Sequence, residues 1–195
     1  ENAARVVACT GGSTNGGLHL PAIAHEAGID FDLFDVCDIF HDTPYFVNLR
    51  PGGEYVAKDL YEVGGIPVVM KELAKAGLLH LDCITASGRT LGEELEEIRG
   101  EPDGKVIHPV ATPLTPTGGV VGLRGNLAPD GAVLKPSAAS PHLMRHRGRA
   151  VVFDDIDDYK ARIGDEALDI DDQSIDESTQ TGAAGAQGVS NKAHR

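Results

Sequence analysis

Four glycines in eight residues, Thr10 to Gly17, limit what the start of this chain can form. The stretch follows the apolar run Arg5–Cys9 and precedes residues 18–27, where apolar residues recur at helical spacing. This order predicts a strand, a tight turn and a helix. Pro21 lacks an amide hydrogen and clashes with the preceding helical turn, so the regular helix is expected to start late or to kink there.

The residues inside the turn are suited to binding an anion. Glycines permit positive φ and let a ligand approach the backbone closely. Ser13, Thr14 and Asn15 are residue types that cap a helix, whose free N–H groups favour a carboxylate or phosphate. Ser13, Thr14 and Asn15 are therefore the candidate substrate-binding residues.

The spacing excludes two common nucleotide sites. A P-loop needs Lys and then Ser or Thr at the end of the stretch, where this chain has Gly17 and Leu18. A dinucleotide-binding turn needs a glycine three residues after Gly12, where Asn15 stands. A tight connecting turn without a ligand remains the alternative.

Composition restricts the partners and the compartment. The formal charge of −13 over 195 residues argues against binding the phosphate backbone of nucleic acid. No apolar run approaches a membrane span and no signal peptide opens the chain, so we expect a cytoplasmic protein that has no membrane partner. Cys9, Cys37 and Cys83 are odd in number and widely spaced, which suits a reducing compartment.

The element pattern predicts an α/β fold in three stretches. Residues 1–104 alternate strand-like and helical segments and form part of an α/β domain. Residues 105–172 contain short β-prone pieces between turns, which predicts a linker and the start of a β-rich domain. Residues 173–195 have almost no large apolar residue and are predicted to be a disordered tail.

Local signals place several elements within these stretches. They predict a helix at 33–41 capped by Asp32, a helix from Ile66 to Ala76, a buried strand at 82–86, a helix from Thr90 to about Ile98 with a Thr90–Glu93 capping box, a turn at Pro129-Asp130-Gly131, and a helix at 155–163.

Spacing alone assigns no catalytic and no metal-binding residue. Among the eight histidines, His19 and His25 are six residues apart and would lie on different faces of a helix. The basic residues at 142–149 are of a kind that can hold an anion, but such clusters more often pair with nearby acids, here those at 154–158.

Four separated blocks carry a more specific signal. They are Gly11 to Asn15 with Leu18-His19-Leu20, Glu62 to Pro67, Leu78-Leu79-His80 with Asp82-Cys83, and Leu123 to Ala132. In this order they resemble the dihydroxy-acid dehydratase and 6-phosphogluconate dehydratase family, over about residues 2 to 172. The resemblance implies the end of an N-terminal α/β domain followed by the start of a β-barrel-like C-terminal domain.

The activity implied by the resemblance is that of a hydro-lyase, which converts a 2,3-dihydroxy carboxylic acid to a 2-keto acid. The segments Lys135 to His142 and Arg147 to Phe153 look most like the members that dehydrate pentonates such as arabinonate or xylonate. Many similar sequences carry the name dihydroxy-acid dehydratase, an enzyme of branched-chain amino-acid synthesis. Family members are also expected to be homo-oligomers.

The cofactors implied by the resemblance are an iron–sulfur cluster, which acts as Lewis acid on the 3-hydroxyl, and Mg²⁺ on the substrate carboxylate and 2-hydroxyl. A serine alkoxide takes the C2 proton. In the family the cluster cysteines, and the acidic residues and modified lysine around magnesium, precede the position of Glu1, and the serine follows that of Ile175. From Asp176 onward we find nothing that resembles the family. We therefore expect an internal fragment that lacks the cofactor ligands and is inactive in isolation.

A second interpretation assigns the chain to a different class. A non-catalytic protein would keep only a carboxylate-binding turn, or would act as an interaction module that pairs with a complete subunit. Iron and sulfide analysis together with a keto-acid assay separates this interpretation from the first.

Overall fold

The computed structural model describes residues 1–126, 128–136, 139–140, 142, 144–165, 167–171, 174–178 and 189–190. In these ranges the chain is a mixed helix and sheet (α/β) protein, as predicted. It divides into two compact units, Glu1–Gly122 with Val133–Ala139, and Leu123–Ala132 with Ser140–Arg195. The boundaries expected at residues 104 and 172 stay a prediction.

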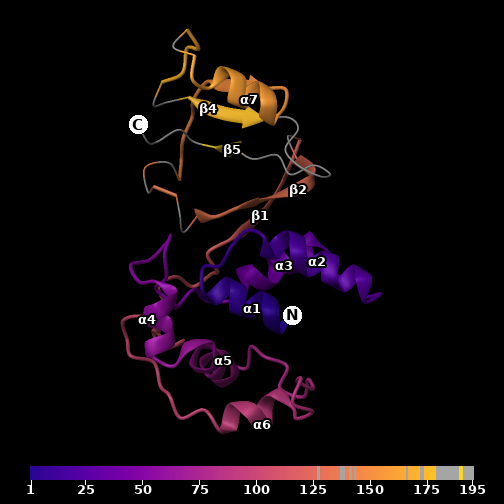
Figure 1. The fold of residues 1–195 in the computed structure, drawn as a ribbon, viewed down its shortest axis with the longest axis vertical. Coiled ribbons are helices and arrows are strands. Elements are labelled where there is room, and N and C mark those ends of the chain that lie inside the picture. Colours follow the sequence, from indigo (N-terminus) through magenta and orange to yellow (C-terminus); the bar gives the residue numbers. More distant parts are fainter. Residues whose placement is uncertain are drawn as a thin grey trace. The chain divides into compact units, whose positions relative to one another are not determined.

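Helices dominate the first unit (Figure 1). They are α1 (Asn2–Cys9), α2 (Gly16–Glu26), α3 (Leu33–His41), α4 (Ala57–Glu62), α5 (Gly65–Lys75) and α6 (Leu91–Glu96). Within residues 1–100, all of which are described, there is no β-strand, and β-pairing is limited to isolated bridges. The predicted alternation of strands and helices in this region is therefore wrong.

The first element, α1, replaces the predicted strand at Arg5–Cys9. Ala4 and Ala8 lie one helical turn apart and are both buried, and alanine has the highest helix propensity. The five residues from Arg5 were too short a window to separate a helix from a buried strand. The glycine-rich stretch therefore follows a helix.

Helix α3 confirms the helix predicted at 33–41 and its predicted cap, Asp32. The Asp32 carboxylate accepts a hydrogen bond from the Phe34 N–H at 2.7 Å and caps the helix. Its apolar residues Val36, Cys37 and Phe40 are buried. Because α1 packs against α3, this face fixes the end of α1 from which the glycine-rich stretch departs.

Helix α2 departs from its prediction. It begins at Gly16 and contains Pro21, so it does not start late, and the alternative, a kink at Pro21, stays a prediction. The first residues of a helix have no intrahelical acceptor, and the turn before Gly16 supplies them with one. The helix is also poorly covered, since Leu18 is 64% and Ile23 is 66% exposed.

Helix α5 ends before Gly77 and α6 begins at its cap Thr90 as predicted, but α6 ends at Glu96, before the expected Ile98. Gly77 follows α5 with φ 69°, and the Thr90–Glu93 capping box opens α6. Ala76, expected to be the last residue of α5, is the exposed residue that follows it. The buried strand predicted at 82–86 is wrong, because Ile84 is 69% exposed and forms only an isolated bridge.

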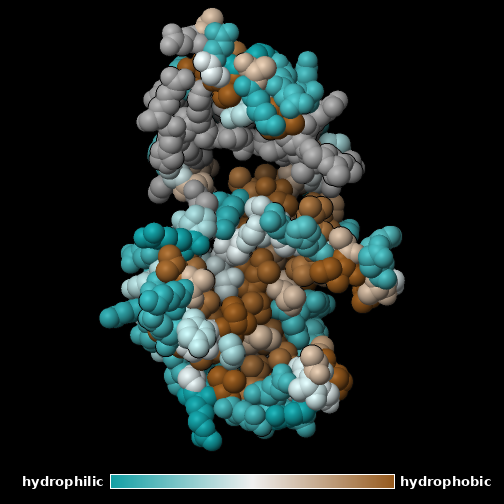
Figure 2. All heavy atoms as spheres, in the orientation of Figure 1, coloured by the Kyte–Doolittle hydropathy of each residue, from teal (hydrophilic) through white to brown (hydrophobic). Residues whose placement is uncertain are grey.

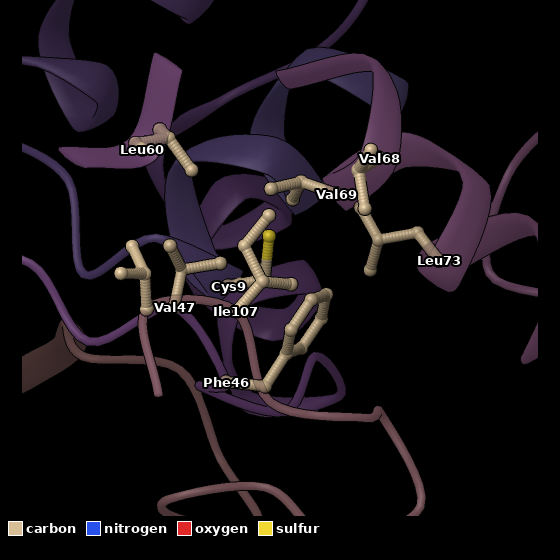
Figure 3. Packing of buried hydrophobic residues seen from close by; sticks show 9 residues of the cluster. Cys9, Phe46, Val47, Leu60, Val68, Val69, Leu73 and Ile107 are labelled. Atoms are coloured by element: carbon tan, nitrogen blue, oxygen red, sulfur yellow. The ribbon is translucent and has the colours of Figure 1, made fainter. Parts of the chain in front are cut away.

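The main core of the first unit gathers side chains from α1, α4, α5 and two extended segments, 46–47 and 106–107 (Figure 3). Its buried members are Cys9, Phe46, Val47, Leu60, Val68, Val69, Leu73, Val106 and Ile107. A second cluster joins α1 and α3 to Val120. Helix α1 contributes to both clusters, so its C-terminal end is held on two sides.

Strands β1 (Val121–Gly125) and β2 (Ala128–Leu134) form a two-stranded sheet. The turn predicted at Pro129-Asp130-Gly131 is wrong, because these residues lie within β2. Gly131 keeps the positive φ expected of a turn glycine, at 101°, but uses it inside the strand. The connection between the strands precedes Pro129.

The second unit also holds β3 (Ala150–Phe153), α7 (Ile156–Arg162), β4 (Ile175–Ser178) and β5 (Val189–Ser190). Strand β4 pairs in parallel with β3 and antiparallel with β5. The predicted helix at 155–163 is confirmed. Strands β4 and β5 and Ser174 lie within the stretch 173–195 that is predicted to be a disordered tail, its other residues lie outside the described residues, and the tail stays a prediction.

No helix in the described ranges is both long and apolar enough to cross a membrane. Several large apolar side chains are nevertheless exposed, and Figure 2 shows hydrophobic residues at the surface beside hydrophilic ones. Those on α2 are the most exposed apolar side chains near the glycine-rich stretch.

Candidate functional site

The glycine-rich stretch first terminates α1. The Gly12 N–H donates to the Val7 carbonyl at 2.8 Å, and the Gly11 N–H donates to the Ala8 carbonyl at 3.1 Å. Gly11 has φ 58°, the left-handed backbone of the Schellman arrangement that ends many helices. The first glycine pair is thus required by helix termination, which corrects the strand-to-helix turn predicted from the sequence.

The amides that open α2 are already used by the turn. The N–H groups of Gly16, Gly17 and Leu18 donate to the carbonyls of Ser13, Thr14 and Asn15 at 3.0 to 3.1 Å. No side chain caps the helix at Asn15, although a cap was expected there. The cradle of free helix amides predicted for an anion is therefore wrong, because this tight first turn pairs them with carbonyls.

The predicted substrate-binding side chains lie together on the outside of this turn. Ser13 and Asn15 are exposed, and Thr14 is half-buried. The Ser13 hydroxyl accepts a hydrogen bond from the Asn15 N–H at 3.2 Å. The side chains can reach a ligand in solution, and their role as substrate-binding residues stays a prediction.

Tyr45 packs directly on the turn. A Cβ atom at Gly11 would lie 2.7 Å from Tyr45 Cε2 and 3.2 Å from Cζ, so only glycine permits this contact. The Tyr45 N–H donates to the Thr115 carbonyl, and the Tyr45 carbonyl accepts from the N–H groups of Leu114 and Thr115. The backbone therefore holds the ring in place against the turn.

The Tyr45 hydroxyl is buried without a hydrogen-bond partner among the residues that the structure describes. The residue is 5% exposed, and burial raises the pKa of its phenol. The hydroxyl thus stays protonated at neutral pH and keeps a hydrogen to donate. Unpaired buried hydroxyls are costly and call for a physical explanation.

Lys135 reaches the same turn from the end of β2. Its ammonium group donates to the Gly12 carbonyl at 2.9 Å, across 123 positions of sequence. Partial burial lowers the pKa of this lysine. The direction follows from desolvation, which disfavours the charged form. Tyr45 and Lys135 thus contact the neighbouring residues Gly11 and Gly12.

The three cysteines do not form a cluster site. Cys9 is buried in the main core, where burial raises the pKa of its thiol, while Cys37 is buried against Gly122 and Cys83 is exposed. No group of three or more His, Cys, Asp or Glu side chains in the described residues is arranged to hold a metal ion. The residues present therefore do not fit an iron–sulfur cluster or a magnesium site.

One member of the basic cluster and one member of the acidic run each form an ion pair outside the other group. Arg149 forms an ion pair with Asp169 at 2.9 Å, outside the run at 154–158. Within the run, Asp158 pairs with Arg162 of its own helix at 2.7 Å. Such exposed pairs stabilise little and define no binding site.

Sequence reasoning missed both groups that contact the turn. Lys135 belongs to a segment singled out only for its resemblance, and Tyr45 carried no signal at all. Sequence spacing does not show that residues 11, 45 and 135 lie together, since their contact depends on tertiary packing.

Comparison with known proteins gives two family matches. The N-terminal description of dihydroxy-acid/6-phosphogluconate dehydratases matches residues 1–94, and the C-terminal description matches residues 105–192. The second match extends through most of the residues after Asp176 in which the sequence reading found no family resemblance, and corrects it.

Named relatives fall into two groups of enzymes. The dihydroxy-acid dehydratase of Dinoroseobacter shibae is 66% identical over 154 residues, covering 79% of this chain and 27% of the relative. The L-arabinonate dehydratase of Rhizobium leguminosarum bv. trifolii is 52% identical over 189 residues, covering 97% of this chain and 32% of the relative. The L-arabonate dehydratase of Azospirillum brasilense is 48% identical over 190 residues, covering 97% of this chain and 32% of the relative.

The chain spans between a quarter and a third of the length of these curated relatives. Both family descriptions match in the order of the N-terminal and C-terminal domains, and together they leave only short stretches of this chain uncovered. The chain belongs to the dihydroxy-acid/6-phosphogluconate dehydratase family.

Proposed function

We propose that this chain is part of a dehydratase that removes water from a 2,3-dihydroxy carboxylic acid and yields a 2-keto acid. The names of the relatives support the reaction class. The structural observation that carries the proposal is the Lys135 ammonium, partly buried on the glycine-rich turn, where the chain also presents Ser13, Thr14 and Asn15.

The substrate class matches the chemistry of this turn. A dihydroxy acid carries one carboxylate and two neighbouring hydroxyl groups. A partly buried ammonium group attracts the carboxylate more strongly than an exposed one, because water screens it less. The hydroxyl groups of Ser13 and Thr14 and the amide of Asn15 both donate and accept hydrogen bonds, as substrate hydroxyls require.

The described residues do not supply the groups that the bond-breaking step requires. Hydroxide is a poor leaving group and a C2 proton is weakly acidic, so the reaction needs a Lewis acid and a base. The family resemblance supplies an iron–sulfur cluster, Mg²⁺ and a serine for these roles in a whole protein. Because the cysteines and acids described here do not fit those cofactors, the contribution proposed for this chain is binding and orientation of the substrate.

Three finer properties belong to the same proposal. The β-strands of the second unit are the start of a barrel-like C-terminal domain. The complete protein is a homo-oligomer, and its substrate is either a branched dihydroxy acid or a sugar acid such as arabinonate. The long coverage by the two arabinonate and arabonate dehydratases favours the sugar acid, whereas the higher identity to dihydroxy-acid dehydratase favours the other.

Binding and turnover separate the parts of this proposal. The purified chain is titrated with L-arabinonate and 2,3-dihydroxybutanoate, with pentanoate and butanoate as matched carboxylates without hydroxyl groups, and affinities are measured by calorimetry. We expect tighter binding of at least one dihydroxy acid than of its matched control. Equal affinity for both members of each pair would remove the proposed substrate class.

A second assay tests the expected inactivity of the isolated chain. After anaerobic reconstitution with iron and sulfide, we expect no bound cluster and no 2-keto acid from either substrate. A bound cluster with turnover would show that residues of this chain supply the cofactor ligands, and it would contradict the proposed restriction of the chain to substrate binding.

The alternative function is an interaction module, and the exposure of Leu18 and Ile23 on α2 favours it. Apolar surface that is exposed in contiguous patches commonly marks a protein contact. Pull-down of a complete dehydratase subunit by this chain, and its loss in Leu18→Ser with Ile23→Ser, would support the module. A chain that binds hydroxy acids but no subunit would contradict it.

A further inference from the structure

The unpaired Tyr45 hydroxyl is the feature that the proposed function has not used. A buried hydroxyl without a partner loses its hydrogen bonds to water and gains none in return. Tyr45 Oη is the buried side-chain polar atom of the described residues for which this holds. Native proteins keep such groups where strain, water, an ion or a ligand accounts for them.

The position of the ring selects among these explanations. The Cε2 and Cζ atoms face Gly11, and Cζ is the atom that carries the hydroxyl. The next residue, Gly12, accepts the Lys135 hydrogen bond. A neutral donor and a cationic donor are therefore brought to two consecutive residues from segments far apart in sequence.

We propose that Tyr45 is a specificity-determining residue, whose hydroxyl donates a hydrogen bond to a hydroxyl oxygen of a hydroxy carboxylate held by Lys135 at the glycine-rich turn. The inference rests on the proposed function and adds to it a discrimination between hydroxylated and plain carboxylates. Lys135 attracts the charge that every carboxylate carries. Tyr45 increases the affinity only of a ligand that carries an additional oxygen to accept its hydrogen bond.

The choice of glycine at position 11 supports this division of roles. A Cβ atom there would push the ring away, since the 2.7 Å approach is shorter than real Cβ contacts allow. The helix termination explains the positive φ of Gly11, and the ring explains why no side chain can be placed there. Burial keeps the phenol protonated, so the group acts as a donor over the neutral pH range.

Tyr45→Phe removes the hydroxyl and keeps the ring against Gly11. We expect this variant to bind the preferred dihydroxy acid about tenfold more weakly, the size of one lost hydrogen bond, with no change for the matched carboxylate. Tyr61→Phe is the control, because Tyr61 is 81% exposed on α4 and lies outside the turn. Lys135→Gln is expected to weaken both ligands, and Lys58→Gln, at an exposed lysine, is expected to weaken neither.

A spectroscopic readout makes the contact visible. The chain has four tyrosines, so ¹³C labelling at Cζ gives few resonances, and the one missing in Tyr45→Phe identifies Tyr45. We expect this resonance to move on addition of the dihydroxy acid and to stay unchanged with pentanoate or butanoate.

The outcomes distinguish the two proposals. If the parent chain does not prefer a dihydroxy acid to its matched carboxylate, the proposed function fails. If the parent chain does prefer it and Tyr45→Phe keeps the same preference, only the role of Tyr45 is overturned. An unmoved Tyr45 resonance with an unchanged affinity would assign the hydroxyl to an internal water instead.

Discussion

Two polar regions of the first unit treat their buried groups in opposite ways. On α5, the buried Glu72 carboxylate accepts from Lys75 at 2.5 Å and from the Val110 N–H at 3.2 Å. Lys71 and Lys75 both reach Glu101, at 2.6 and 2.7 Å. At the glycine-rich turn, by contrast, the buried Tyr45 hydroxyl has no partner among the described residues.

The difference separates a structural network from a binding site. Each buried polar group of the α5 network has a hydrogen-bond partner within the network, so the network stabilises the fold and needs no ligand. The turn holds a donor whose partner the described chain does not supply. Buried polar groups are normally satisfied, and the exception is therefore the place to look for a ligand. Unfolding of the purified chain, in urea or by heat, tests this contrast.

Gly11→Ala is expected to give the largest effect, a loss of about 3 kcal/mol in the free energy of unfolding. An L-residue in the left-handed region costs about 1–2 kcal/mol, and overpacking adds roughly the same again. Gly28→Ala is the matched control, since Gly28 ends α2 in the same arrangement with φ 69° but has nothing within 4 Å. It should cost about 1 kcal/mol. Equal losses would show that the Tyr45 ring exerts no constraint on the turn.

Glu72→Ala is expected to lower the free energy of unfolding by about 2 kcal/mol, because it leaves the Val110 N–H unpaired in the interior. Glu72→Gln keeps an oxygen for that N–H and should lose less. Glu62→Ala, which removes an exposed pair with Lys58, should change the value by about 0.5 kcal/mol or less. A Glu72→Ala chain as stable as the parent would end the contrast between the two regions.

Acid should weaken the α5 network before it affects the turn. Hydrogen bonds from Lys71 and then Lys75 lower the pKa of Glu101 from 4.5 to about 2. A lowered carboxyl pKa contributes stability that is full above pH 4.5 and is lost as the pH falls toward 2. We expect the difference in Tm between the parent and Glu101→Gln to be positive at pH 6 and to shrink across this window. A difference that is constant with pH would contradict the pairing.

Tyr45→Phe is expected to give the smallest effect on unfolding. Removing a hydroxyl that has no partner should leave the stability unchanged or raise it slightly, by about 0–1 kcal/mol. The same variant is the one expected to lose ligand affinity. A marked loss of stability would reveal a structural partner for the hydroxyl and would place Tyr45 with Glu72 rather than with the binding site.

Local signals made part of the fold predictable. Three helices are capped by hydrogen bonds to residues two or three positions away, at Asp32, Thr90 and Asp155. The starts of α3, α6 and α7 can therefore be predicted from short stretches of sequence. Helix α1 was missed because its buried alanines begin before the apolar run that drew attention. The turn signal at Pro129-Asp130-Gly131 was overridden by pairing of β2 with β1.

The candidate site was only half predictable for the same reason. Ser13, Thr14 and Asn15 lie beside the glycines in sequence. The hydrogen bonds that end α1 also join residues close in sequence, so this part of the site could be located from the sequence. Tyr45 and Lys135 reach the turn through packing between distant segments, for which no alternation or spacing rule exists. The cofactor expectations came from resemblance and remain proposals for a whole protein.

The long separation between Gly12 and Lys135 also bears on the order of folding. The bonds that close the turn span at most five residues and can form together with α1, whereas the lysine closes a loop of 123 positions and pays the entropy of doing so. During synthesis, which proceeds from the N-terminus, α1 to α6 are complete before β2 exists. The turn can therefore form before its charged partner, and a nascent chain carries a shaped but uncharged turn until Lys135 reaches Gly12.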